Sequence, residues 1–172
     1  MRSATIRTAT SSDAEAALAY FSALQAENLK TVFQVDTLPT LDEERDFLCG
    51  FERDPNSNWF AAEIDSAIVG NLGLKADPRR QRHHAAVLGI SVLEPYRSAG
   101  LGTRLMETAI SWAEASALRS IELDVLEINS GAIRLYERFG FAVYGKCPEA
   151  VLVDGEYLAV IEMSRSVLGN AA

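Results

Sequence analysis

Two glycines, two positions apart, give the segment Arg97-Ser98-Ala99-Gly100-Leu101-Gly102 the chemistry of an anion-binding loop. Gly100 and Gly102 can adopt backbone angles that other residues avoid, and they let the main chain approach a ligand closely. The N–H groups of the helical turn expected next point into the loop, where the helix dipole favours negative charge. This arrangement predicts a bound diphosphate.

The residues around the loop separate this interpretation from its alternatives. No Gly-Lys-Ser/Thr follows, which excludes a P-loop, and Leu105 stands at the third glycine position of a dinucleotide fingerprint. A plain strand-to-helix turn with two glycines stays open. If the loop does bind an anion, Arg97 and Arg104 could add charge-assisted contacts at its edge.

A second segment strengthens the interpretation of the loop. Residues 129–141 read Asn-Ser-Gly-Ala-Ile-Arg-Leu-Tyr-Glu-Arg-Phe-Gly-Phe. With the loop, this segment resembles the GNAT superfamily of acyl-CoA-dependent N-acyltransferases, whose first signature is Arg/Gln-x-x-Gly-x-Gly/Ala between a strand and a helix. Arg97, Gly100 and Gly102 match all three defined positions, and residues 129–141 look like the second signature. The resemblance covers about residues 84–163.

A length of 172 residues fits one domain over residues 1–172, and the resemblance implies an α/β fold of the α+β type. Its sheet would be mixed, mostly antiparallel and twisted, with about six or seven strands, helices on both faces and a V-shaped splay between the two central strands. It also implies acetyl-CoA as acyl donor. Neither of the two cysteines has a nearby Cys or His at metal-ligand spacing, so we expect no metal.

The resemblance further implies where the coenzyme lies. Its diphosphate would contact backbone N–H groups from Ser98 to Thr103, and its pantetheine arm would pair with the central strand near Val92. Asn129 would bind a pantetheine amide, or it would cap its own helix. Ala132 is also expected to contact the coenzyme. Many relatives have a basic residue where this chain has Ala99.

Aminolysis of a thioester requires a proton donor for the thiolate and a donor to the carbonyl oxygen. Tyr136 is the candidate proton donor, because a free tyrosine has a pKa near 10, close to that of an alkyl thiol. The resemblance supports this role, although Tyr136 also shares a helical face with Ala132, Leu135 and Phe139 and could be a core aromatic. The resemblance assigns the carbonyl oxygen to the backbone N–H of Val92.

The base that accepts the ammonium proton has several candidates. Glu94, at the end of the central strand, ranks first. Glu122 and Asp124 alternate with apolar neighbours and could line the cleft, and His84 could serve as a neutral imidazole. Each could equally be a solvated polar side chain.

The segment from Val151 to Met163 resembles the end of relatives that acetylate amino acids, similar small compounds or protein N-termini. We expect a small-molecule amine as acceptor, with a protein N-terminus as the alternative. Two rival hypotheses are a non-catalytic acyl-CoA sensor and a plain nucleotide-binding module. A role in protein interaction through a homodimer would be compatible with catalysis.

Composition narrows the class of protein. The formal charge is −8, which argues against a nucleic-acid surface. No run approaches the roughly 20 apolar residues of a membrane span, and the first residues, Met1 to Arg7, predict a strand and not a signal peptide. Two cysteines in 172 residues suit a reducing, cytoplasmic setting.

Hydrophobic periodicity and turn residues predict alternating elements. Helices are expected over about residues 14–27, 41–53, 101–117 and 130–139. Strands are expected over 5–8, 59–64, 67–74, 84–93, 121–126, 141–146 and 157–163. The strand at 84–93 is apolar on both faces, which is typical of a central strand.

Overall fold

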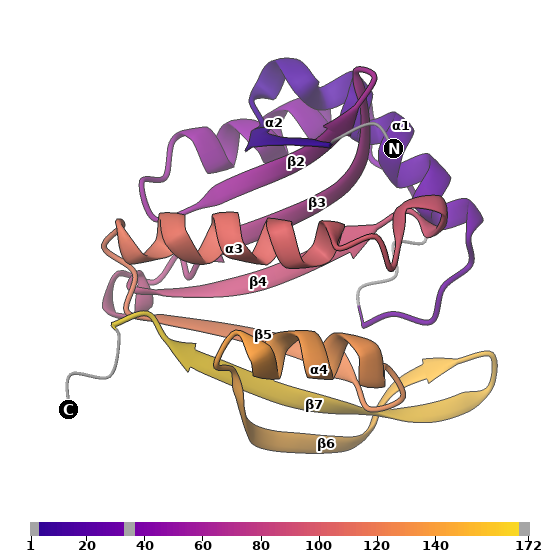
Figure 1. Ribbon diagram of the computed structural model, residues 1–172, viewed down its shortest axis with the longest axis vertical. Helices are drawn as coiled ribbons and strands as arrows, with labels where there is room; N and C mark the ends of the chain where they lie inside the picture. The colour runs from indigo at the N-terminus through magenta and orange to yellow at the C-terminus, as the bar shows by residue number, and fades with distance from the viewer. Residues whose placement is uncertain (1–3, 33–36, 169–172) are drawn as a thin grey trace.

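The computed structural model describes residues 4–32 and 37–168, and these residues form one sheet with helices packed on it (Figure 1). The strands are β1 (Thr5–Thr8), β2 (Asn58–Ile64), β3 (Ala67–Ala76), β4 (Ala85–Val92), β5 (Ser120–Leu126), β6 (Ala142–Val153) and β7 (Glu156–Ser166). The α-helices are α1 (Ala14–Ala26), α2 (Leu41–Glu52), α3 (Leu101–Glu114) and α4 (Ser130–Arg138). Short 3-10 turns are η1 (Ser11–Asp13), η2 (Arg80–Arg82) and η3 (Glu94–Tyr96).

The sheet has seven strands in the order β1-β2-β3-β4-β5-β7-β6. Every neighbouring pair is antiparallel except β4 and β5. The parallel ladder runs only from Ala85–Ser120 to Val87–Glu122, although β4 continues to Val92 and β5 to Leu126. The two strands therefore diverge beyond this ladder, which Figure 1 also shows. The predicted mixed sheet and its V-shaped splay are confirmed.

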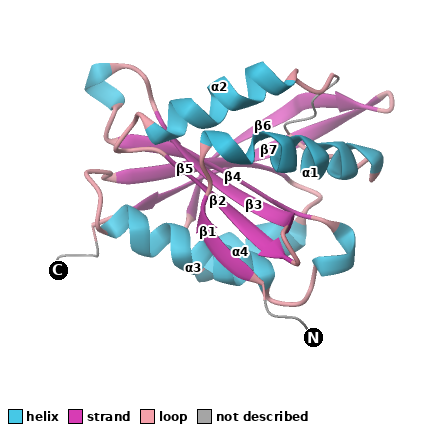
Figure 2. Ribbon diagram, turned by 90° about the horizontal axis from the view of Figure 1, so that it is seen from above, coloured by secondary structure: helices cyan, strands magenta, loops and turns pink. Residues whose placement is uncertain are grey.

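The helices cover both faces of the sheet: α1 and α2 lie on one face, α3 and α4 on the other (Figure 2). The larger core lies under α3 and α4, where the expected helical spacing places Leu105, Met106 and Ala109 fully inside. A second core under α1 and α2 includes Trp59 and Tyr20. The faces of β4 differ, because Leu88 is buried in the larger core whereas Val87, on the opposite face, is 47% exposed.

Local signals explain most element boundaries. Thr40 and Glu43 form a capping box at the start of α2. The β2–β3 hairpin turns at Asp65 and Ser66, which both have positive φ. The predicted helix at 101–117 is too long at its end, because Ser116 Oγ donates to the carbonyl of Ala113 at 2.7 Å just after α3 ends.

The prediction for the last hairpin was also too short. β6 extends to Val153, well beyond residue 146, and β7 begins at Glu156. Two register shifts, between Val143 and Gly145 and between Cys147 and Val151, allow β6 to stay paired with β7 across irregular residues. Such bulges hide the alternation of side chains that marks a strand in a sequence.

A buried carboxyl in α2 gives a stability test. Glu44 is 3% exposed, its Oε1 has no hydrogen-bond partner, and burial raises its pKa. The folded state therefore retains the proton to higher pH than the unfolded state, and stability falls as the pH rises above the ordinary carboxyl pKa. We expect Glu44→Gln to raise the melting temperature at pH 7 by about 3 °C, from about 1 kcal/mol.

The control for this variant is the same comparison at about pH 3, well below the ordinary carboxyl pKa, where the carboxyl is protonated in both states and the gain should disappear. Thermal unfolding followed by circular dichroism measures both values. A melting temperature equal to or below that of the parent at pH 7 would contradict the assignment.

Candidate active site

The first turn of α3 is an uncapped helix end. Gly100 occupies the N-cap position with φ of 81°, no side chain caps the turn, and no acidic residue lies in it. The first helical bond runs from Arg104 N–H to the Gly100 carbonyl at 3.1 Å, so the N–H groups of Leu101, Gly102 and Thr103 have no acceptor within the helix. By contrast, α2 has a capping box and three acids in its first turn. The start of α3 is therefore suited to an anionic ligand.

The loop before α3 has the geometry that its glycines suggest. Ser98 also has positive φ, at 58°, and Ala99 is exposed. A Cβ added at Gly100 would meet no atom within 4 Å, and one added at Gly102 would meet only Leu135 Cδ2, at 3.5 Å. Gly100 is required by its backbone angle, whereas at Gly102 the protein itself leaves room for a side chain. The space beside Gly102 is thus available to a ligand.

The two arginines expected at this site contact protein groups. Arg97 Nε donates to the Val92 carbonyl at 2.7 Å, and its Nη2 pairs with Glu27. Arg104 Nη2 donates to the Ala4 carbonyl at 2.8 Å. Contacts of either arginine with a diphosphate stay a prediction.

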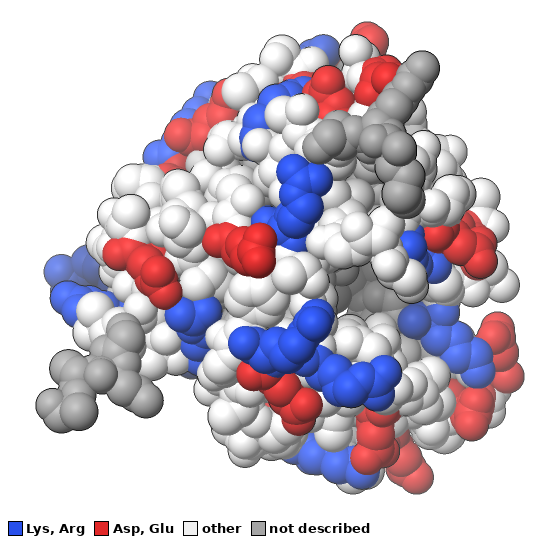
Figure 3. Space-filling view, in the orientation of Figure 1, with Lys and Arg blue, Asp and Glu red and all other residues white. Residues whose placement is uncertain are grey.

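A basic residue that sequence reasoning missed contacts the uncapped turn. Arg138 Nη2 is 3.4 Å from Thr103 Oγ1, which joins the end of α4 to the start of α3. Arg134 lies one turn earlier on α4, and both arginines are exposed. Figure 3 shows basic side chains gathered over α4 beside a hollow between α3 and α4. The spacing of the two arginines, four residues apart in the second motif, was the available signal.

The divergence of β4 and β5 leaves backbone groups of β4 facing a gap. Leu93 N–H donates to the Val69 carbonyl of β3 at 2.9 Å. Because successive residues of a strand direct their N–H groups to opposite sides, Val92 N–H points away from β3, toward the side of β5. No ladder with β5 reaches this position, since the pairing ends at Val87. The structure thus presents a strand edge inside the sheet, at the residue that the resemblance assigned to the carbonyl oxygen.

Tyr136 lies on α4 and packs in the larger core. Its side chain is 6% exposed, and its ring centroid is 5.9 Å from that of Phe141. The two fully buried polar side-chain atoms without a partner in residues 4–32 and 37–168 belong to Glu44 and Asn58, so the Tyr136 hydroxyl is not sealed in the core.

Burial raises the pKa of Tyr136 to about 12. Sequence reasoning had assumed an ordinary value near 10, and the structure corrects it. Because this pKa lies above that of an alkyl thiol, which is near 10, full proton transfer from the phenol to the thiolate is unfavourable. Below pH 10 the phenol stays protonated, and it can donate a hydrogen bond.

Asn129 acts as a helix cap. Its Oδ1 accepts the backbone N–H of Ala132 at 3.1 Å, at the first turn of α4. Ala132 is half-buried and packs against the larger core. Of the two roles left open for Asn129, the structure contains the cap, and a contact with pantetheine stays a prediction for both residues.

The face of the sheet opposite α3 and α4 carries a row of acids. Asp124 on β5 lies directly opposite Glu162 on β7, and Gly145 on β6 lies opposite Glu162. A Cβ at Gly145 would lie 2.1 Å from Glu162 Oε2, so this glycine makes room for the carboxylate. Glu122 lies on the same face, where it pairs with Arg82 at 3.1 Å.

The candidate bases therefore occupy different places. Glu94 is exposed in η3, just beyond Val92. Asp124 lies past the point where β4 and β5 separate, and Glu122 lies at that point. His84 precedes β4 at the paired end of the two strands, roughly 25 Å of extended chain from Val92. His84 therefore lies far from the part of β4 that β5 leaves unpaired.

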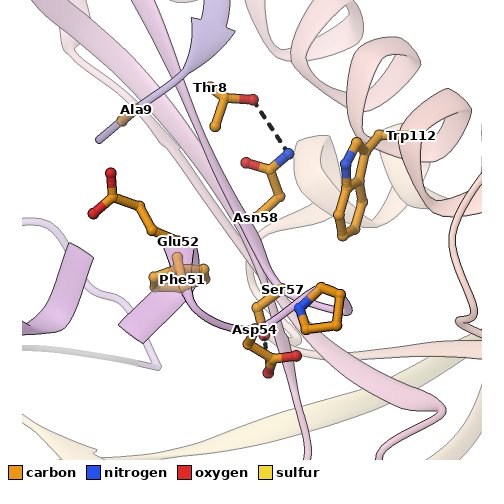
Figure 4. Close-up of a pocket in the computed structure, with 9 residues that line it drawn as sticks. Thr8, Ala9, Phe51, Glu52, Asp54, Ser57, Asn58 and Trp112 are labelled. Carbon is orange, nitrogen blue, oxygen red and sulfur yellow. Dashed lines mark hydrogen bonds between the residues drawn. The ribbon is translucent and has the colours of Figure 1, made fainter. Parts of the chain in front are cut away.

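A pocket of about 260 Å³ lies elsewhere, between β1, the end of α2 and Trp112 of α3 (Figure 4). Thr8 Oγ1 accepts from Asn58 Nδ2 at 3.2 Å on its wall. The lining includes Glu52 and Asp54 and no basic residue, so it does not suit a diphosphate. Within the described residues there is no cluster of three or more potential metal ligands, and no helix is long and apolar enough to cross a bilayer.

Comparison with known proteins agrees with this geometry. A model of the acetyltransferase (GNAT) family matches residues 20–141. The L-amino acid N-acetyltransferase AaaT of Escherichia coli K12 is 33% identical over 113 residues, which are 64% of this chain and 69% of AaaT. Five further curated relatives match over 39–59% of their own length.

Solved structures extend the match to almost the whole chain. A GNAT-family acetyltransferase from Streptococcus pneumoniae superimposes with a TM-score of 0.89 at 30% identity, covering 95% of this chain and 98% of that one. YncA of Salmonella typhimurium, a putative acetyltransferase solved with its cofactor acetyl-CoA, has the same fold, with a TM-score of 0.86 at 18% identity over 98% and 96% of the two chains. The splayed sheet, the glycine loop and these matches lead to one conclusion: the chain belongs to the GNAT family of acetyltransferases.

Proposed function

We propose that this protein transfers the acetyl group of acetyl-CoA to the amine of a small molecule. The proposal rests on the separation of β4 from β5. This separation leaves the Val92 N–H unpaired, and the chain then continues to the uncapped turn at Gly100. A diphosphate, an extended amide chain and a thioester carbonyl are the ligands that such a path of backbone donors suits.

The coenzyme would lie along this path. Its diphosphate would accept from the N–H groups of Leu101, Gly102 and Thr103, with Arg138 adding positive charge. Its pantetheine arm would extend β4 on the side that β5 leaves. The similarity of the fold to a protein solved with acetyl-CoA supports this assignment.

The reaction would proceed by direct attack. The neutral amine nitrogen forms a bond to the acetyl carbon, and the carbonyl oxygen takes up negative charge, which the Val92 N–H stabilises. The bond between carbon and sulfur then breaks. The amine proton passes to a base or water, and the coenzyme thiolate accepts a hydrogen bond from Tyr136 before it takes a proton from solvent.

The acidic row supports a cationic acceptor. Asp124 and Glu162 are like charges directly opposite each other on neighbouring strands, an arrangement that destabilises a sheet. Neither carboxylate has an ion-pair partner within residues 4–32 and 37–168. An ammonium group on this face would offset their repulsion, and carboxylates near the thioester could also receive its proton. Glu94 remains the first candidate for the base, with Asp124 next.

The relatives support a small acceptor. AaaT, which matches 64% of this chain, is an L-amino acid N-acetyltransferase. An amino acid or a related amine is therefore the acceptor class that we propose to test first.

Substitution of Gly102 tests the coenzyme site. We expect Gly102→Val to weaken acetyl-CoA binding at least about tenfold, because the side chain would occupy the space needed by the diphosphate, while the melting temperature shifts by only a few degrees. Isothermal titration calorimetry measures the affinity. Gly100 is unsuitable for this test, since its positive φ would strain any side chain. Unchanged affinity in a folded Gly102→Val protein would move the coenzyme elsewhere.

Substitution of Tyr136 tests its role at the sulfur. Tyr136→Phe keeps the ring and removes only the hydroxyl. We expect kcat to fall about tenfold to a hundredfold, the loss of one hydrogen bond to a developing anion, with the Kd of acetyl-CoA changed less than threefold. The parent should keep its activity up to pH 10, because the phenol does not ionise below that pH. If kcat stayed at the parental value, Tyr136 would be a core residue only.

A screen of acceptors tests the reaction itself. Release of free coenzyme A thiol from acetyl-CoA is followed with amino acids, polyamines, aminoglycosides and peptides that have free N-termini. We expect turnover with an amino acid or small amine, and a KM raised about tenfold by Asp124→Asn and Glu162→Gln together, because these changes remove the charge that attracts an ammonium group. Turnover with peptides alone would assign a protein N-terminus as acceptor. Binding of acetyl-CoA without turnover on any amine would favour a sensor.

A further inference from the structure

Glu27, at the end of α1, binds two residues of the segment that connects β4 with α3. Its Oε1 accepts the backbone N–H of Glu94 at 2.7 Å, and its Oε2 pairs with Arg97 Nη2. Arg97 Nε in turn donates to the Val92 carbonyl at 2.7 Å. One carboxylate thus ties together the end of β4, the first residue of η3 and the first residue of the glycine loop.

The contacts of this Glu27–Arg97 clamp are sheltered from water. The Glu27 side chain is 13% exposed and that of Arg97 is 33% exposed, so their interaction is screened less than a surface pair would be. The carbonyl that accepts from Arg97 and the N–H proposed to bind the thioester oxygen both belong to Val92. Arg97 therefore contacts the strand end that carries this N–H. The clamp therefore acts at both ends of the path proposed for the coenzyme.

The helix that carries Glu27 is itself fixed against the sheet. Two turns earlier, the Tyr20 hydroxyl lies 2.7 Å from Ser91 Oγ and 3.1 Å from Asn71 Oδ1, on β4 and β3. Ser91 precedes Val92 in β4. Tyr20 therefore holds α1 against the same strand end that Glu27 reaches through Arg97, and the position of Glu27 relative to the loop is determined on both sides.

We propose that Glu27 is a positioning residue for coenzyme binding, which acts by holding Arg97 and the Glu94 N–H so that the loop presents its amides in a fixed arrangement. The inference rests on the proposed function. It differs from the expectation that Arg97 contacts the diphosphate, because the clamp uses the guanidinium inside the protein and cancels its charge with Glu27.

The two roles of Arg97 predict opposite effects of removing the charge of Glu27. If Arg97 is a diphosphate ligand restrained by Glu27, Glu27→Gln frees the guanidinium and acetyl-CoA binds more tightly. If Glu27 and Arg97 form a clamp, the loop loses its fixed arrangement and acetyl-CoA binds more weakly. Gln is nearly isosteric with Glu and keeps an acceptor for the Glu94 N–H, so Glu27→Gln changes mainly the charge.

The experiment is a double-mutant cycle on the full chain. Acetyl-CoA affinity is measured by isothermal titration calorimetry for the parent, Glu27→Gln, Arg97→Gln and the double variant, with melting temperatures to verify folding. We expect each single change to weaken binding about five- to tenfold, and the double change to weaken it by about the same factor and not by the product.

A matched control removes the same charges elsewhere. Asp42 and Arg45 form an exposed ion pair on α2, at 2.7 Å. Asp42→Asn with Arg45→Gln should leave the affinity unchanged. Salt dependence gives a second measurement, since Arg97→Gln should leave the slope of log Kd against log salt unchanged, whereas Arg138→Gln should reduce it.

The outcomes are distinguishable. Four results would each overturn the clamp and leave the proposed function standing. Two concern the single variants: tighter binding by Glu27→Gln, or parental affinity in both. The others are multiplicative losses in the double variant and a reduced salt slope in Arg97→Gln. A folded parent that does not bind acetyl-CoA would overturn the proposed function, and the inference with it.

Discussion

The three-residue parallel ladder between β4 and β5 is the constraint on which the rest of this structure depends. It holds the two halves of the sheet together at Ala85–Val87 and then stops, although both strands continue. A sheet interior normally satisfies its backbone groups strand to strand. Here the sequence maintains an unpaired edge at the centre of the molecule, and apolar side chains from α3 and α4 close one side of it. The site follows from that edge, since the strand ends at Val92 and Gly100, the N-cap of the uncapped helix α3, follows eight residues later.

Charge is distributed around this edge in a consistent way. The helix end at Gly100 provides partial positive charge without any nearby acid in its own turn, and Arg138 adds to it from α4. The opposite face of the sheet carries Asp124 and Glu162. An anionic coenzyme and a cationic amine would therefore favour different faces, and the reacting groups would meet between them. Arg97 contributes little net charge to either side because Glu27 neutralises it.

The parts of this description that the sequence predicted are those encoded by short segments. The glycine spacing at 100 and 102, the helix from residue 101 and the two strands that end at 64 and begin at 67 are local signals, and the structure contains each of them. The splay was expected from resemblance alone. Contacts between distant segments could not be predicted, such as Glu27 with Arg97, 70 positions apart, or Arg138 with Thr103, 35 apart. The pKa of Tyr136 also depends on burial, which no pattern of residue types measures.

The bulges of β6 have a consequence at the outer limit of the sheet. β6 is the last strand in the sheet order, and Val143, Tyr144 and Leu152 on it are exposed. A long, regular, apolar strand at such a position would be a template on which further chains could add. The two register shifts and Pro148 break its row of free amide and carbonyl groups. At the other limit β1 has only four residues. Both edge strands of the sheet, β1 and β6, are therefore poor templates for the strands of other chains. The sheet nevertheless has an unpaired edge inside it, between β4 and β5.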